Sequence, residues 1–371
     1  MANPKRGISS KAAINQVKVD SLPYFYFRSS EDIIPYGTDN LYPNRIVDAI
    51  KKSPTAKGCV KKQSEFIFGK GTGTDIVVNR HGETLDDVVK QSIDHGYSNL
   101  GGFGIHMNFN LLGQITEMFF VSMEFIRKQK TMQKVEYSVW DTIRTNIYLT
   151  ESEEIYLYDP DKFLHQVKES GGFAKYKGAC KIMNSDLGLY PVSPVDSASI
   201  SASFEKEAQI YPYANIRNGF SNNTLIKLPT LADGKEADEI VSDFEEKIRS
   251  MHGADKAGSS IVTTVPANAT GETSPFQMIE NMTPTNVDEM FINQNAKAEA
   301  DILKCYNMPA ELIGIQKKGG VFNGQAYKEA YNMKILDSIS MQNEVVSFYN
   351  KLLPRSVFGI DSISLTPLDP M

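Results

Sequence analysis

The side chains that usually carry catalytic or metal chemistry are few and scattered in this sequence. The chain has five histidines and three cysteines: His81, His95, His106, His165, His252, Cys59, Cys180 and Cys305. None of them forms a His-Glu-x-x-His or Cys-x-x-Cys pattern, and no Gly-x-Ser-x-Gly nucleophile turn is present. The sequence therefore predicts no catalytic residue, no metal site and no cofactor, and it favours scattered surface or half-buried histidines.

One stretch, residues 69–74 (Gly-Lys-Gly-Thr-Gly-Thr), invites comparison with a phosphate-binding loop. A Walker loop needs Gly, four residues and then Gly-Lys-Ser/Thr, so that backbone amides surround the phosphates and the hydroxyl reaches Mg²⁺. Here Lys70 is followed by Gly71, and the position five before Gly69 is Ser64. The sequence favours a flexible turn between a helix and a strand. A nucleotide- or metal-dependent DNA-processing enzyme is the weaker alternative.

The composition is that of an ordinary folded protein with a small excess of acid. The chain has 371 residues, with 39 Lys+Arg against 45 Asp+Glu, a net charge of −6, and 41% hydrophobic and 23% charged residues. This length supports one large domain or about two to three smaller ones. Proteins that grip DNA are usually basic, so this acidic chain is not expected to bind DNA tightly.

Targeting signals are not evident. An odd number of widely spaced cysteines suits a reducing compartment. No apolar run approaches the ~20 residues needed to cross a bilayer, and no apolar stretch follows the basic residues 1–14. We expect a protein made in the cytoplasm with no membrane partner.

Hydrophobic periodicity in the first half of the chain predicts a mixed α+β module. Its predicted elements are a helix over 44–67 broken at Pro54, a helix over 84–97, and strands at 105–110, 115–121 and 155–158. Residues 193–203 are small and polar, which is typical of a surface loop.

The last 140 or so residues are predicted to be mainly helical. The predicted elements are a capped helix over 233–253, strands at 261–265 and 276–279 in a hairpin-like insertion, a polar helix over 285–306, a long helix over 323–353 and a strand over 356–368. Two-stranded units are marginal alone, so the insertion is expected to need partner strands.

The junction between the last two helices carries a recognisable pattern. It reads Ile302-Leu-Lys-Cys-Tyr-Asn-Met-Pro309-Ala-Glu-Leu-Ile-Gly314, then a Lys/Gly loop, then Asn323-Gly-Gln-Ala-Tyr-Lys-Glu-Ala into a long helix. This arrangement resembles the tailed-bacteriophage portal protein family, in which a "Pro-Pro-x-Leu-Leu-Gly"-like turn joins two helices. The second proline of that motif is Ala310 here. The segments 40–43 and 100–127 are similar to the family's N-terminal α/β region.

The resemblance implies a portal-like α+β fold, a mixed α/β wing with two stem helices flanking a small β clip and a long C-terminal helix. The implied units are an arm and wing (1–232), stem helix 1 (233–253), clip (254–284), stem helix 2 (285–307), turn and tunnel loop (308–323), and long helix with C-terminal strand (324–371). The tail after Pro354 is short, so any C-terminal crown is expected to be reduced.

The resemblance also implies roles for particular residues. The residues expected to line a DNA channel as a tunnel loop are Lys317, Lys318, Gly319, Gly320 and Asn323. The residues expected in a clip that docks the packaging terminase are Ile261, Val262, Val265, Phe276 and Met278. The residues expected at the subunit interface of the stem are Asn293, Ala296, Lys297 and Ala300.

The implied function is a non-enzymatic ring of about twelve copies at one capsid vertex, closed by a head-to-tail interface. Double-stranded DNA would pass through it without sequence specificity during packaging and ejection. The implied partners are the terminase large subunit, a head–tail connector or adaptor, and capsid and scaffold proteins. The implied location is the virion, with the host cytoplasm during assembly. A different structural virion protein, such as an adaptor or minor capsid protein, is the main alternative.

Overall fold

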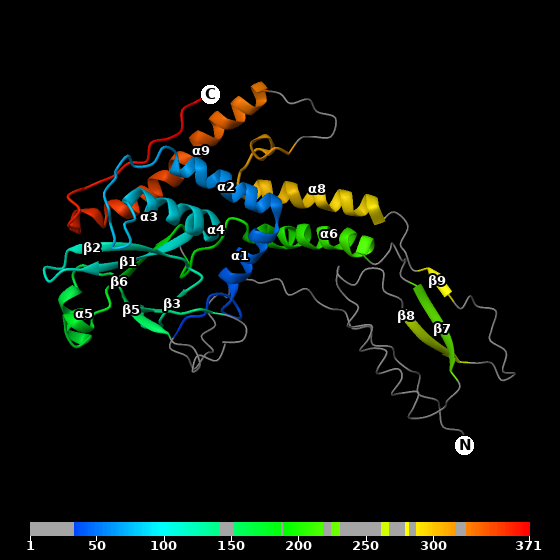
Figure 1. Cartoon of the computed structure of the whole chain (residues 1–371), viewed down its shortest axis with the longest axis horizontal. Helices are drawn as coiled ribbons and strands as arrows, with labels where there is room; N and C mark the ends of the chain where they lie inside the picture. The colour runs from blue at the N-terminus through cyan, green and yellow to red at the C-terminus, as the bar shows by residue number, and fades with distance from the viewer. Residues whose placement is uncertain are drawn as a thin grey trace, which may run out of the picture.

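The computed structural model describes residues 33–140, 152–186, 188–217, 224–230, 261–266, 279–281, 287–315 and 324–371. These residues form an α+β structure with a six-stranded sheet, a separate three-stranded sheet and several helices (Figure 1). Among the helices in these ranges, none is long and apolar enough to span a membrane.

The first helices are the predicted broken pair. α1 (Tyr42–Lys52) ends at Ser53, and α2 (Pro54–Phe68) begins at Pro54. Proline is favourable at the first position of a helix because its missing N–H has no partner there anyway. The Ser53 hydroxyl accepts a hydrogen bond from the Ala56 amide at 3.0 Å and so caps α2.

The larger sheet has the strand order β2-β1-β6-β5-β4-β3. Its strands are β1 (Gly102–Phe109), β2 (Ile115–Val121), β3 (Ile126–Lys128), β4 (Lys134–Tyr137), β5 (Glu153–Leu157) and β6 (Ala179–Asn184). Only the β5–β6 pair is parallel, and α5 (Phe163–Glu169) and a 3₁₀ turn (η3, Phe173–Lys175) lie in that crossover. The predicted strands over 105–110, 115–121 and 155–158 are confirmed.

Side chains alternate across this sheet and supply two hydrophobic cores. Along β6, Ala179 and Met183 join the second core, whereas Cys180 and Ile182 join the first. The first core is shared with α1, α2 and the start of α9 (Gly324–Asn350). The second is shared with α3 (Leu85–Gln91) and the end of α9. Helix α9 therefore contributes side chains to both cores.

The predicted helix over 84–97 is present but changes type along its length. Thr84 and Asp87 form a capping box at the start of α3. The chain continues as a π-helix (η1, Ser92–Tyr97) and a short turn, α4 (Ser98–Leu100). Position 96 requires glycine, because a Cβ there would lie 2.5 Å from the Cβ of Phe103 on β1.

The predicted surface loop over 193–203 is wrong. The segment forms a 3₁₀ turn (η4, Asp196–Ala198) and then begins α6 (Ser199–Arg217). Val195, Ala198 and Ala202 are buried in the first core. This stretch was predicted as a loop because its side chains are small. The same small side chains allow it to pack closely against α1 and α8 (Val287–Cys305).

Helices α6 and α8 lie side by side and run antiparallel (Figure 1). The Ser197 hydroxyl, just before α6, is 3.2 Å from the sulfur of Cys305 at the end of α8. The rings of Phe204 and Phe291 stack between the helices. After α8, the predicted Met308-Pro309 turn leads into a 3₁₀ turn, η6 (Ala310–Ile313).

The smaller sheet corrects the predicted hairpin. Its strands are β7 (Thr224–Thr230), β8 (Ile261–Pro266) and β9 (Ile279–Asn281), in the order β8-β7-β9. β8 and β9 do not pair with each other, because β7 lies between them, parallel to β8 and antiparallel to β9. β7 comes from before the predicted insertion and supplies the partner strand that the sequence analysis expected. Figure 1 shows this sheet beyond the ends of α6 and α8, apart from the larger sheet.

The predicted strand over 356–368 is also wrong. After a 3₁₀ turn (η7, Leu353–Arg355), only Ser356 makes a ladder contact, an isolated bridge to Ile115. Ile363 and Leu365 are buried in the second core, so the alternating pattern reflects a tail that packs over other elements.

Candidate functional site

The stem residues predicted on α8 share one face of that helix. Asn293, Ala296 and Lys297 are exposed and Ala300 is half-buried. Ala298, which the same sequence segment also supplied, is buried, with 4% of its surface exposed. The spacing of the four residues places them on one side of α8, the side opposite the buried Ala298.

The other predicted site residues are only partly placed. Ile261, Val262 and Val265 belong to β8, where they pair with Leu225, Ile226 and Pro229 of β7. The residues that lie outside the described part of the chain are Phe276, Met278, Lys317, Lys318, Gly319, Gly320 and Asn323, together with the helix predicted over 233–253.

A groove of about 350 Å³ lies between α6, α8 and the start of α2. Its lining consists of Pro54, Thr55, Glu205, Ala208, Gln209, Phe291, Ile292, Asn295 and Glu299. The groove lies where α6 and α8 meet the start of α2, and it contains two carboxylates, Glu205 and Glu299.

Glu205 on α6 is 4% exposed and is held by the start of α2. One of its oxygens, Oε2, accepts hydrogen bonds from the Ser53 hydroxyl at 2.5 Å and from the Thr55 amide at 3.2 Å. The other oxygen, Oε1, is buried and has no hydrogen-bond partner among the described residues. Burial, with the nearby charge of Glu205, raises the pKa of Glu299 above its usual value.

A buried lysine, Lys334, fixes the junction between α8 and α9. It is 0% exposed, and its Nζ donates to the carbonyls of Tyr306 at 2.9 Å and Asn307 at 3.1 Å. These carbonyls follow the last turn of α8, where a cation is favourable. Burial lowers the pKa of Lys334, opposed by the charge of Asp337. Lys334 was not predicted from the sequence as a buried residue, although it stands four positions after Ala330 in the apolar stripe.

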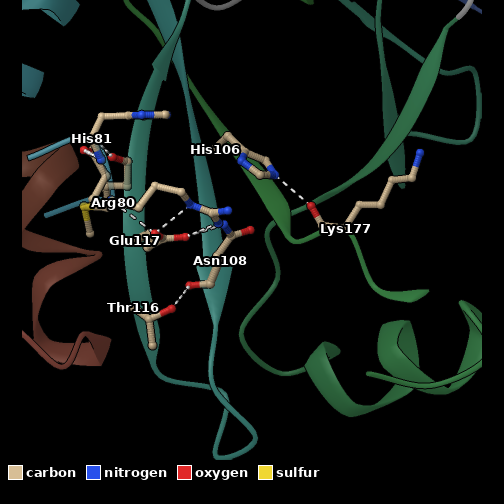
Figure 2. Close-up of polar contacts among 9 residues, drawn as sticks. Arg80, His81, His106, Asn108, Thr116, Glu117 and Lys177 are labelled. Atoms are coloured by element: carbon tan, nitrogen blue, oxygen red, sulfur yellow. Dashed lines mark hydrogen bonds and ion pairs between the residues drawn. The ribbon is translucent and has the colours of Figure 1, made fainter. Parts of the chain in front are cut away.

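A polar cluster lies on strands β1 and β2 of the larger sheet (Figure 2). Arg80 donates to both oxygens of Glu117, from Nε at 3.0 Å and from a terminal nitrogen at 2.5 Å, and Asn108 adds a third bond at 2.7 Å. The Arg80 hydrogen bonds lower the pKa of Glu117. In Figure 2 both Arg80 and Asn108 point at this carboxylate. It is a structural tie between the loop at 79–83 and the β1–β2 pair.

His106 belongs to the same cluster. Its Nε2 lies 2.8 Å from the carbonyl oxygen of Lys177, to which it donates (Figure 2). Burial lowers the pKa of His106, with the carbonyl bond opposing. One nitrogen is thus used in holding β1 near the segment before β6. Within the described ranges no three His, Cys, Asp or Glu side chains converge on a possible metal position.

The Gly-rich segment at 69–74 forms a turn, as predicted, and hydrogen bonds within the chain hold it. Its amides donate to other parts of the chain: Lys70 to the Thr366 carbonyl at 2.8 Å, Gly71 to Phe68 at 3.0 Å, and Thr72 to Asp86 at 2.9 Å. A phosphate loop needs such amides free to surround its ligand. The segment therefore does not support the nucleotide-dependent alternative.

Comparisons with known proteins gave matches among solved structures alone. No protein-family model matches the chain. No curated protein matches it either. A chain described as the neck of a native gene transfer agent particle, computed with C12 symmetry, has a TM-score of 0.47 and 15% identity, covering 88% of this chain and 84% of its own. A chain from the virion of the native particle has a TM-score of 0.46 and 15% identity, covering 87% and 83%.

A third match is an HK97 family phage portal protein from Corynebacterium diphtheriae. Its TM-score is 0.42 and its identity 10%, covering 86% of this chain and 94% of that one. A portal protein is thus among the matches. It is the family that the sequence resembles.

Proposed function

We propose that the chain is a portal-type structural protein of a virion, one subunit of a closed ring through which double-stranded DNA passes. The observation that carries the proposal is the antiparallel pair α6 and α8, which joins a two-core body to a small sheet set apart from it (Figure 1). Paired helices with a polar, solvent-exposed outer face can pack against neighbouring subunits. The motif at 302–330 supports the same function.

This proposal replaces the first stem helix that the resemblance implied. Helix α6 packs along α8, and the chain leaves α6 toward β7 and re-enters α8 after β9. We therefore assign the stem to α6 and α8, and the clip to the segment that runs from β7 to β9. The segment 233–253 then belongs to the clip.

Within this proposal the segment between η6 and α9 is the tunnel loop. It would present Lys317 and Lys318, beside Gly319 and Gly320, to the channel. Lysine side chains make non-specific contacts to DNA phosphates, and a net charge of −6 disfavours tight binding of the duplex. Lys334 holds the turn before η6, through the carbonyls of Tyr306 and Asn307.

The remaining roles follow from the position of the small sheet. A sheet set away from the cores is available to bind the terminase large subunit during packaging and a head–tail connector afterwards. The body would contact capsid and scaffold proteins at the vertex. No enzymatic step is assigned to the chain itself.

Electron microscopy of the purified full-length chain tests the proposal. We expect closed rings, of about twelve copies, with an axial hole in end-on views. A species no larger than a dimer at high protein concentration, by imaging and by sedimentation, would count against the portal assignment.

A further inference from the structure

The groove between α6 and α8 contains a carboxylate, Glu205, of which one oxygen has no hydrogen-bond partner among the described residues. Glu205 is 4% exposed, and only its Oε2 is hydrogen bonded. An ionised carboxylate buried with an unpaired oxygen is costly unless a cation or donor meets it. The described residues that line the groove include no lysine or arginine.

The rim of the groove combines acidic side chains with an exposed apolar one, which suits contact with another protein. Glu299 adds a second carboxylate, and Ile292 is 61% exposed beside it. An exposed isoleucine next to two carboxylates fits a long side chain with an apolar stem and a cationic end, such as lysine. A metal ion fits less well, because no group of three ligating residues lies there among the described residues.

The opposite side of α8 carries such a side chain. Lys297 is exposed, and no ion pair joins it to any residue within the described ranges. Residues 291, 292, 295 and 299 follow the groove face of the helix, and residues 293, 296, 297 and 300 follow the other face. Lys297 is only two residues from Glu299, so both lie at nearly the same height along the stem.

We propose that Lys297 of one copy inserts into the groove of the next copy and binds Glu205 and Glu299 there. Two different faces of α8 then meet, which is the head-to-tail contact that closes a ring when repeated. The small residues Ala296 and Ala300 let the neighbouring helix approach closely. This inference rests on the proposed ring and names the contact that closes it.

Charge reversal tests the contact. We compare wild type, Lys297→Glu, Glu299→Lys and the double variant as full-length chains, measuring the ring fraction against protein concentration by mass photometry and negative-stain imaging. Each single variant should raise the concentration for half-assembly about tenfold or more, since close charge pairs across interfaces couple strongly. The double variant should recover most of that loss. Lys57→Glu, at an exposed position of α2, is the matched control and should assemble like wild type.

The outcomes separate this contact from the ring itself. Rings from Lys297→Glu at wild-type concentrations, or a double variant no better than the singles, would overturn the contact and leave the ring standing. A wild-type chain that forms no ring would overturn both.

A cross-link provides a second measurement. In a Cys305→Ser background, cysteines placed at 292 and 297 lie on opposite faces of one helix and cannot bond within a chain. Oxidised rings should therefore give a ladder of linked subunits on a denaturing gel. Monomers alone after oxidation of assembled rings would refute the contact.

Discussion

Replacing Lys334 with methionine tests whether one buried ammonium holds the turn after α8 against α9. The side chain is 0% exposed, and its Nζ donates to the carbonyls of Tyr306 and Asn307. Methionine keeps nearly the same length and volume but leaves both carbonyls without this donor. The variant therefore isolates the hydrogen bonds from the packing.

The expected magnitude comes from opposing effects. Two hydrogen bonds from a charged donor contribute about 1.5–3 kcal/mol each. Removing the buried charge returns several kcal/mol of its desolvation cost. We expect Lys334→Met to lower the free energy of unfolding by about 1–3 kcal/mol. Lys334→Ala also leaves a cavity, and its loss should reach about 3–5 kcal/mol.

Urea unfolding followed by circular dichroism, on unassembled subunits, measures these differences. Lys328→Met is the matched control, because Lys328 is exposed on the same helix, and its effect should stay within about 0.5 kcal/mol. A Lys334→Met variant as stable as wild type would refute the reasoning, since the carbonyls would then not depend on the ammonium.

The pH dependence of the same variant gives a second check. The pKa of Lys334 is lowered from 10.5 in the folded state, so the unfolded chain binds more protons in the window just below 10.5. Wild-type stability should gain from this residue as the pH rises through that window. In Lys334→Met that contribution should be absent, and an unchanged slope between the two proteins would contradict the burial of the charge.

Three further predictions concern other parts of the chain. The pKa of His106 is lowered from 6.5 in the folded state, so the unfolded state binds more protons below that pH. The free energy of unfolding should therefore fall as the pH drops through 6.5. His106→Gln should reduce this pH dependence, measured by urea unfolding at about pH 5.5 and 7.5. Ser53→Ala removes the cap of α2 and a bond to Glu205, and should cost about 1–2 kcal/mol in the same assay, against a negligible effect of Ser203→Ala on the exposed side of α6. Replacing residues 224–281 by a short linker should leave the unfolding transition of the two-core body in place while abolishing terminase binding in a pull-down, and retained binding would remove the clip assignment.

Much of the body could be predicted from the sequence because its signals are local. A proline at the start of α2 and an apolar stripe every three or four residues define α1, α2 and α9 wherever they end up in space. The strands β1 and β2 were predicted from β-branched and aromatic residues between turn residues. The Met308-Pro309 turn between α8 and α9 follows from backbone sterics alone.

The errors fall where a distant partner decides the structure. Residues 193–203 carry the composition of a loop, but α1 and α8 cover them and make a helix favourable. β8 and β9 were expected to pair with each other, yet β7 lies between them. The alternating tail after Pro354 packs its apolar side chains on the second core and does not pair as a strand.

The sequence by itself determined where most helices begin and end, the absence of catalytic motifs, and the resemblance at the junction of α8 and α9, because these depend on neighbours a few residues away. Only the tertiary structure decided that α6 is the partner of α8, that Glu205 keeps an unpaired oxygen at their junction, and that Lys334 lies under the turn. Burial and pairing of a charge depend on residues far along the chain, and no local pattern records them.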